Sequence, residues 1–309
     1  MARFTVRQEP EALVVRVAGV DVARYAFAED APAFEGPKPY LHPIRALSGA
    51  VLTGFRPWDH RWHKGLQMTL TDVSGQNFWG GNTYVRGRGY VALDNVGRIR
   101  HDRFTTIVAE EEALVEEDLT WITQAGASWL SERRALRFHA VDGTRGLWAL
   151  DLSSTLRNAA GHALVLGSPT TNGRENAGYS GAFLRLPRSF TGGEVTAPGP
   201  AGVVSRAEAD ADALMGTDAP WLAFSGHHDE VDGGGTILAF AGGSSGEPAI
   251  RWFVRSQPTP VLAPSPTFAE PVSLAPGAEL RLTHRFVFLD RIRTPEEIAA
   301  LAAELALVA

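Results

Sequence analysis

Apolar and polar residues alternate with a period of two along most of this chain. Across residues 148–156, WALDLSSTL, the even positions are mostly apolar and the odd positions mostly polar, and residues 280–288 repeat the alternation. This pattern is typical of half-buried strands in an antiparallel sheet. It predicts further strands near residues 12–18, 21–27, 66–73, 104–109, 113–123, 135–141, 179–186, 220–225, 236–241 and 249–255.

Glycine-rich turns separate these segments, and no helices intervene, so the pattern predicts an all-β chain. We expect a single domain, residues 1–309, built as an antiparallel β-sandwich. Residues 194–219 are rich in Ala, Gly, Pro and Asp, and we expect a long surface loop there.

One helix is predicted, over residues 295–307. Thr294 is a suitable N-cap, Pro295 takes the first helical position, and Glu297 completes a capping box. The segment that follows is rich in Ala and Leu. We expect this helix to close one end or edge of a sheet.

Composition narrows the classes of function. The net charge of -6 and the scattered arginines argue against a nucleic-acid partner, which needs clustered Lys and Arg. The absence of cysteine excludes disulfides, zinc thiolate sites and a thiol nucleophile. The N-terminus lacks the apolar stretch of a signal peptide, and no apolar run reaches the ~20 residues of a membrane helix. We therefore expect a soluble, cytoplasmic protein that does not bind membranes.

The densest chemistry lies in residues 55–66, FRPWDHRWHKGL. His60 and His63 could form an imidazole pair, with Asp59 orienting one ring or acting as a third metal ligand. Alternatively, one histidine caps a loop while the other packs under a tryptophan. The spacing alone does not decide between these interpretations.

Other polar residues stand in apolar surroundings and are candidates for a site. Each of them alone also fits a structural ion pair or a turn cap; they are His42, Arg45, His101, Glu132, Arg174 and Tyr179. His228 lies in the sequence HHDE before a glycine-rich turn, which predicts a solvated hairpin tip. The sequence has no P-loop, no dinucleotide fingerprint and no nucleophile elbow, so we expect no nucleotide cofactor.

Several motifs resemble a bacterial family of unknown function, DUF6807, whose members are often labelled "methane oxygenase PmoA". The matching segments cover most of the chain: PYLHPIRALSG (39–49), DHRWHKGL (59–66), GQNFWGG (75–81), GRIRHDRF (97–104), SERRALRF (131–138), GYSGAFLR (178–185) and IRWFVR (250–255). Trp62 replaces the first of two adjacent histidines in the commoner form of the motif. A membrane-bound methane oxygenase needs membrane spans, so we regard the label as a mislabel.

The resemblance implies a role in sugar catabolism and a fold similar to the galactose-mutarotase type of supersandwich. In that fold, sugar-active enzymes place histidines and carboxylates on the concave face of the larger sheet. We accordingly expect residues 59–63 to lie in a pocket rather than on a convex turn.

Two functions from different classes remain open. The first is a carbohydrate-active enzyme of the lyase, hydrolase or epimerase type, acting on a sugar or keto-sugar. The second is a non-catalytic carbohydrate-binding or regulatory sandwich, in which the histidines only bind sugar hydroxyls. The enzyme requires that His60, His63 and Glu132 meet in one pocket, and the binding module does not.

The enzyme hypothesis assigns a role to each candidate. His60 and His63 act as acid and base, or as ligands of a divalent metal; Asp59 orients a ring, and Glu132 is the carboxylate. Sugar C–H groups pack on indole faces. The expected substrate-binding residues are His42, Arg45, Trp58, Trp62, Trp79, His101, Arg174 and Tyr179.

Overall fold

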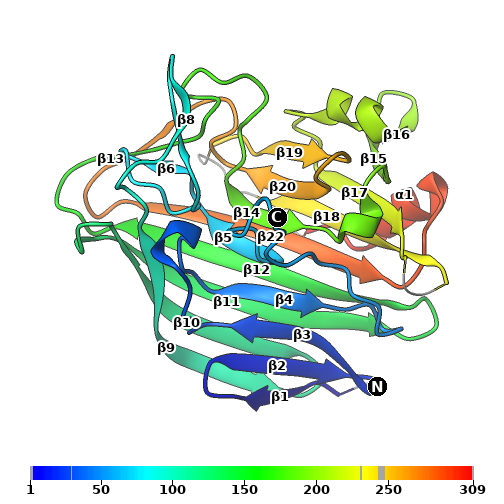
Figure 1. The fold of residues 1–309 in the computed structure, drawn as a ribbon. Coiled ribbons are helices and arrows are strands. Elements are labelled where there is room, and N and C mark those ends of the chain that lie inside the picture. Colours follow the sequence, from blue (N-terminus) through cyan, green and yellow to red (C-terminus); the bar gives the residue numbers. More distant parts are fainter. Residues whose placement is uncertain (1–2, 29, 230–231, 243–247, 308–309) are drawn as a thin grey trace.

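Two large antiparallel sheets pack face to face in the computed structural model, which describes residues 3–28, 30–229, 232–242 and 248–307 (Figure 1). The first sheet has eight strands. Their order across the sheet is β1 (Thr5–Gln8), β2 (Ala12–Val17), β3 (Val20–Ala26), β4 (Tyr40–Ile44), β5 (Leu66–Thr69), β14 (Gly181–Arg185), β20 (Val261–Ser265) and β19 (Arg251–Arg255).

The second sheet has nine strands and includes the longest ones of the described chain. Their order is β16 (Gly202–Ala207), β15 (Glu194–Gly199), β17 (Trp221–His227), β18 (Gly234–Gly242), β22 (Glu279–Leu289), β12 (Leu147–Asn158), β11 (Ser128–Asp142), β10 (Ala113–Ile122) and β9 (Arg98–Ala109). Neighbouring strands along the sheet are antiparallel, as the alternation predicts.

Smaller elements flank the two large sheets, and short strands lie at the upper left of Figure 1. Two short sheets are formed by β21 (Val272–Leu274), β13 (Leu164–Gly167) and β6 (Asp72–Val73), and by β7 (Thr83–Val85) and β8 (Gly89–Val91). The 3-10 turns are η1 (Ala33–Glu35), η2 (Arg188–Phe190) and η3 (Glu208–Leu214). No helix of the described residues is long and apolar enough to cross a membrane.

The main core fills the space between the two large sheets. Trp148, Leu150 and Leu152 of β12 face it, as do Phe286 and Phe288 of β22. The alternating positions therefore identify the inner faces correctly. The sequence prediction of an all-β antiparallel sandwich is confirmed.

Two segments differ from the prediction. Residues 194–219 do not form a loop, because β15 and β16 make a hairpin whose Val195 is fully buried. The helix α1 (Pro295–Glu304) has the expected capping box but ends three residues early. The guanidinium of Arg285 donates to the carbonyl oxygens of Leu305 and Ala306, which holds them outside the helix.

Candidate active site

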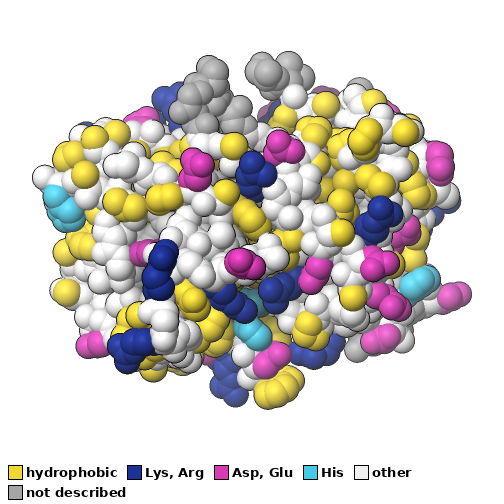
Figure 2. All heavy atoms as spheres, turned by 90° about the horizontal axis from the view of Figure 1, so that it is seen from above, with side chains coloured by type: hydrophobic (Ala, Val, Ile, Leu, Met, Phe, Trp, Pro, Cys, Tyr) yellow, Lys and Arg dark blue, Asp and Glu magenta, His cyan; other side chains and the backbone are white. Residues whose placement is uncertain are grey.

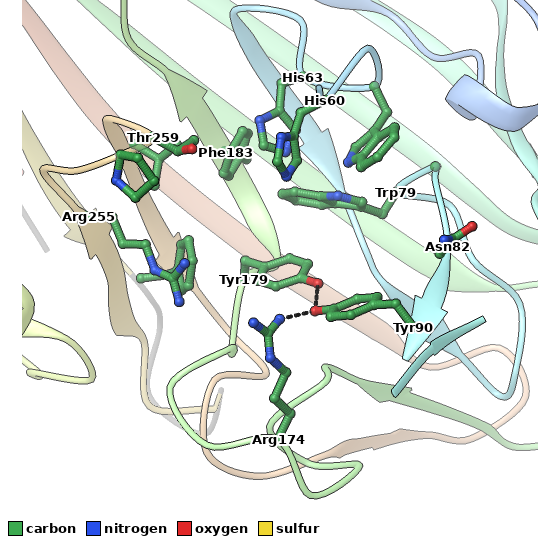
Figure 3. Close-up of a pocket in the computed structure, with 15 residues that line it drawn as sticks. His60, His63, Trp79, Asn82, Tyr90, Arg174, Tyr179, Phe183, Arg255 and Thr259 are labelled. Carbon is green, nitrogen blue, oxygen red and sulfur yellow. Dashed lines mark hydrogen bonds between the residues drawn. The ribbon is translucent and has the colours of Figure 1, made fainter. Parts of the chain in front are cut away.

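A cavity of about 370 Å³ opens on the outer face of the eight-stranded sheet, over β14, β19 and β20. Figure 3 shows how loops and strand ends far apart in sequence converge on it. The residues that line it are His60, Trp62, His63, Trp79, Gly80, Asn82, Tyr90, Arg174, Tyr179, Phe183, Phe253, Arg255, Pro258, Thr259 and Val261.

The floor of the cavity is an apolar cluster separate from the main core. Phe183, Phe253 and Val261 belong to this cluster, while their strand neighbours Leu184 and Val254 face the main core. Because successive side chains of a strand point to opposite faces, the same strands fill the core and build the cavity floor. The strands of the eight-stranded sheet therefore position the floor of the cavity directly.

Aromatic rings continue from the floor up the walls. The ring centroid of Trp79 lies 4.6 Å from that of Phe183 and 4.7 Å from that of Tyr179, and Tyr179 in turn contacts Phe253 at 5.2 Å. Such tilted and edge-on pairs are the favoured arrangements of aromatic side chains. They give the cavity a continuous apolar lining.

The two histidines of the 55–66 segment lie side by side at the wall. Their ring centroids are 4.8 Å apart, and His63 also contacts Phe183 at 4.7 Å. A tight turn produces the pairing, because the amide of His63 donates to the carbonyl of His60. His63 is buried, whereas the His60 side chain keeps 40% of its exposure.

A buried ion cluster anchors this segment to the rest of the fold. The guanidinium of Arg56 makes a bidentate contact with Glu35, at 2.6 and 2.9 Å, and the ammonium of Lys64 lies 3.5 Å from the same carboxylate. Lys64 is fully buried and Glu35 nearly so. Arg56 and Lys64 bracket the histidines in sequence, so the ion cluster fixes both ends of their loop.

The indole of Trp62 packs closely against the backbone of Gly80 and Gly81. Gly80 and Gly81 have φ values of +103° and +68°, and a Cβ at Gly81 would come within 2.8 Å of the indole of Trp62. The Oδ1 atom of Asn77 accepts hydrogen bonds from the amides of Trp79 and Gly80, which holds this turn. The motif NFWGG thus shapes the wall through its backbone as well as through Trp79.

Positive charge surrounds the buried imidazole. Burial lowers the pKa of His63 well below its usual value, and the charges of His60, Arg185 and Lys38 lower it further. Burial and the charge of Arg188 also lower the pKa of Arg185, to about 10. His63 is therefore a neutral imidazole at pH 7.

The opposite side of the cavity carries two guanidinium groups (Figure 3). Arg174 donates a hydrogen bond to the hydroxyl of Tyr90 and lies over the ring of that residue. The hydroxyls of Tyr90 and Tyr179 share a hydrogen bond, and burial raises the pKa of Tyr179 well above its usual value. The guanidinium of Arg255 lies 5.4 Å above the ring centroid of Phe253.

Glu132 does not belong to this site, and the expectation that it joins the histidines is wrong. Its side chain points between the two large sheets, where both carboxylate oxygens bind the guanidinium of Arg134 at 2.8 and 3.0 Å. The indole of Trp121 and the hydroxyl of Ser154 also donate to it. Position 132 has the inward parity of β11, so its charge is satisfied inside the core.

Four other candidates lie away from the cavity lining. His42 binds the hydroxyl of Thr53 and stacks on a phenylalanine; burial and nearby arginines lower its pKa to about 4. Arg45 donates to the carbonyl of Gly49, and His101 binds the buried carboxylate of Glu117. Trp58 is 81% exposed at the outside of its loop.

Asp59 supports the pair from outside the cavity lining. Its carboxylate lies 3.4 Å from Nδ1 of His60 and 3.4 Å from the guanidinium of Arg188. Among the described residues, no group of three or more His, Asp or Glu side chains is placed to hold a metal ion. His228 follows β17 at the hairpin with β18, as predicted, but it is half-buried against Phe190 rather than solvated.

The structure thus brings together His60, His63, Trp62, Trp79, Arg174 and Tyr179 from the predicted set. It adds residues that the sequence did not single out, chiefly Tyr90, Phe183, Phe253 and Arg255. Arg255 ends the segment IRWFVR, one of the family-like motifs, and this is the signal that could have identified it.

Two kinds of comparison with known proteins find similar chains. A family model described as "Family of unknown function (DUF6807)" matches residues 12–303. No curated protein matches the sequence.

Solved structures match nearly the whole chain at low identity. A GH36 alpha-galactosidase from Geobacillus stearothermophilus is 12% identical over 93% of this chain and 41% of its own, with a TM-score of 0.46. An alpha-galactosidase from Lactobacillus brevis is 9% identical over 92% and 39%, with a TM-score of 0.45. A galactose mutarotase related enzyme from Lactobacillus acidophilus is 8% identical over 94% and 100%, with a TM-score of 0.33. The chain covers only 41% and 39% of the two galactosidases.

Proposed function

This chain belongs to the DUF6807 family, and we propose that it is a carbohydrate-active enzyme in which His60 and His63 perform acid–base chemistry on a sugar or keto-sugar. The observation that carries the proposal is the imidazole pair, 4.8 Å between centroids, at the wall of an aromatic cavity. Paired titratable groups in a concave apolar site are the usual setting of proton-transfer catalysis.

The aromatic lining favours a sugar as the substrate. A pyranose ring presents a face of C–H groups, and such a face packs on the flat rings of Trp79 and Tyr179. The cavity volume of about 370 Å³ lies near the lower end of the ~300–1,000 Å³ of small-molecule sites. A monosaccharide, or one unit of a longer saccharide, fits these dimensions.

The environments of the two histidines favour different roles. His63 is neutral at pH 7 because burial depresses its pKa, so it can accept a proton. His60 is partly exposed and is oriented by Asp59, 3.4 Å from its Nδ1 atom, so it can exchange protons with solvent. Lyases, hydrolases and epimerases all need one group that takes a proton and another that gives one.

The proposal predicts a pH dependence with a definite sign. A base whose pKa is depressed stays active above that pKa and loses activity only as the pH falls through it. The acidic limb of the rate profile should therefore lie well below pH 6.5, the ordinary value for histidine.

The test is turnover of a panel of sugars, glycosides and keto-sugars in D₂O, followed by NMR. New products would indicate hydrolysis or elimination, and deuterium entering a C–H bond beside a carbonyl would indicate epimerisation. His63→Ala should lower the rate by a factor of ~10²–10⁴. His60→Ala provides a second variant at a partly exposed position, and His227→Ala, exposed at the end of β17, is the matched control. A His63→Ala protein that is folded and turns over sugar at the normal rate would refute the assignment.

A non-catalytic sugar-binding module is the second candidate. The observation in its favour is that Glu132 lies in the core, so no carboxylate of the described residues lines the cavity beside the histidines. This candidate predicts sugar binding that depends on Trp79, with no chemical change in any sugar of the panel.

A further inference from the structure

The charged side chains that line the cavity are all positive among the described residues. Arg174 and Arg255 line it together with the two imidazoles, and within the described parts of the chain no Asp or Glu side chain does so. The whole protein, in contrast, has a net charge of -6. The face seen in Figure 2 mixes acidic and basic side chains, with one group of Lys and Arg beside a histidine near its lower middle. A concave site of one sign concentrates ligands of the opposite sign.

The two guanidinium groups keep hydrogen-bonding capacity for a ligand. A guanidinium has five N–H donors. Arg174 uses one on the hydroxyl of Tyr90, and Nε of Arg255 is buried with no hydrogen-bond partner among the described residues. Each guanidinium lies over an aromatic ring, Tyr90 for Arg174 and Phe253 for Arg255, which restricts its orientation before a ligand binds.

Several other arginines of this protein are neutralised by carboxylates. Arg145 makes a bidentate contact with Glu304, and Arg285 makes one with Asp151. Neither Arg174 nor Arg255 has an ion pair with any carboxylate in the described chain. Guanidinium groups in an apolar, partly enclosed site are costly without a counter-charge, and a bound oxyanion supplies one.

Two further positively charged side chains, Arg185 and Lys38, lie near the cavity and add to its positive charge. Arg185 is buried on the cavity side of β14, at the parity of Phe183, and its Nε and Nη1 atoms have no partner in the described chain. The positive charges of Arg185 and Lys38 add to the burial that lowers the pKa of His63.

We propose that the sugar bound here carries an anionic group, a carboxylate or a phosphate, which Arg174 and Arg255 bind. The anion would sit near Tyr179, the sugar ring would lie along Trp79, and the reacting carbon would face the histidines (Figure 3). Calling this ligand the substrate rests on the proposed function; the anion site itself does not. Carboxylate and phosphate both present two oxygens on one atom, which can accept two parallel hydrogen bonds from a guanidinium.

The test is calorimetric titration of the full chain with matched sugars: glucose, galactose, glucuronate, galacturonate and glucose 6-phosphate. An anionic sugar should bind about 10- to 100-fold more tightly than its neutral counterpart, the range expected of charge-assisted hydrogen bonds. The uronate and phosphate arms identify which oxyanion the site prefers. Added salt should weaken binding of the anionic sugar and leave the neutral one unchanged.

Variants locate the effect. Arg255→Gln should remove most of the preference for the anion, Arg255→Lys should keep part of it, and Arg206→Gln, on the exposed strand β16, should change nothing. Circular dichroism confirms that each variant is folded. Equal affinity for neutral and anionic sugars, or a preference that survives both Arg255→Gln and Arg174→Gln, would overturn the inference.

The outcome separates this inference from the proposed function. Tight, Arg255-dependent binding of an anionic sugar without any turnover would support the anion site and refute the enzyme. His63-dependent turnover of a neutral sugar with no preference for the anion would support the enzyme and refute the anion site.

Discussion

Replacing Gly81 by alanine tests whether the backbone of the NFWGG turn was shaped around Trp62. Gly81 has a φ of +68°, and its added Cβ would lie 2.8 Å from three atoms of the indole. Holding a non-glycine residue in the left-handed region costs about 1–2 kcal/mol. Overpacking against a fixed ring costs about 1–3 kcal/mol more. We therefore expect Gly81→Ala to lower the free energy of unfolding by about 2–5 kcal/mol.

A second glycine separates the two contributions. Gly87 has a similar φ of +75° but no atom within 4 Å of its added Cβ. Gly87→Ala should therefore show only the backbone cost of about 1–2 kcal/mol. The difference between the two variants measures the contact with Trp62.

The assay is urea unfolding at 25 °C, followed by circular dichroism, of both alanine variants in the wild-type and Trp62→Ala backgrounds. Without the indole, Gly81→Ala should cost no more than Gly87→Ala. This gives a coupling energy of about 1–3 kcal/mol between positions 62 and 81. If Gly81→Ala and Gly87→Ala cost the same in the wild-type background, the close approach of Trp62 to this turn is refuted.

Three further predictions concern residues beneath and beside the site. Glu132→Gln should lower the free energy of unfolding by about 3–5 kcal/mol, because it breaks the buried ion pair with Arg134. The turnover of the folded protein should stay unchanged. A loss of turnover without a loss of stability would place Glu132 in the active site after all. Burial lowers the pKa of His284 from 6.5 to about 4, so the unfolded chain takes up the proton first. The free energy of unfolding therefore falls by about 3 kcal/mol as the pH drops from above 6.5 to 4. His284→Leu should remove that part of the acid sensitivity in urea titrations at pH 7 and pH 4, and an unchanged pH slope would contradict it. Asn77→Ala leaves two backbone amides of the turn at Trp79 without an acceptor, so it should lower the free energy of unfolding, measured in heat or urea, by about 2–4 kcal/mol. A loss below about 0.5 kcal/mol, the size of an ordinary surface substitution, would show that the turn does not depend on Asn77.

The sequence by itself determined the secondary structure where one face of a strand is buried and the other is exposed to solvent. In β12 and β22 the period of two identified both the strands and their inner faces, because most inward side chains are apolar and most outward ones are polar. The start of α1 was equally determined, since a capping box is formed by two residues three positions apart, Thr294 and Glu297. The end of α1 was not, because it depends on the contacts of Arg285 with carbonyl groups twenty residues away.

Only the tertiary structure decided which polar residues share the site. Every residue of β14 is buried, so the alternation that marks a half-exposed strand is missing there, and nothing in the sequence tells that Phe183 faces the cavity while Leu184 faces the core. Glu132 and Arg255 look alike in sequence, each being a charge within an apolar strand pattern. Glu132 lies between the two large sheets and binds the guanidinium of Arg134. Arg255 lines the cavity, where none of the described residues offers it a carboxylate. Glu132 and Arg255 differ because one side chain points into the core and the other points away from it. Which face of a strand is buried depends on how the strand pairs with others far away in the sequence, and not on its local sequence.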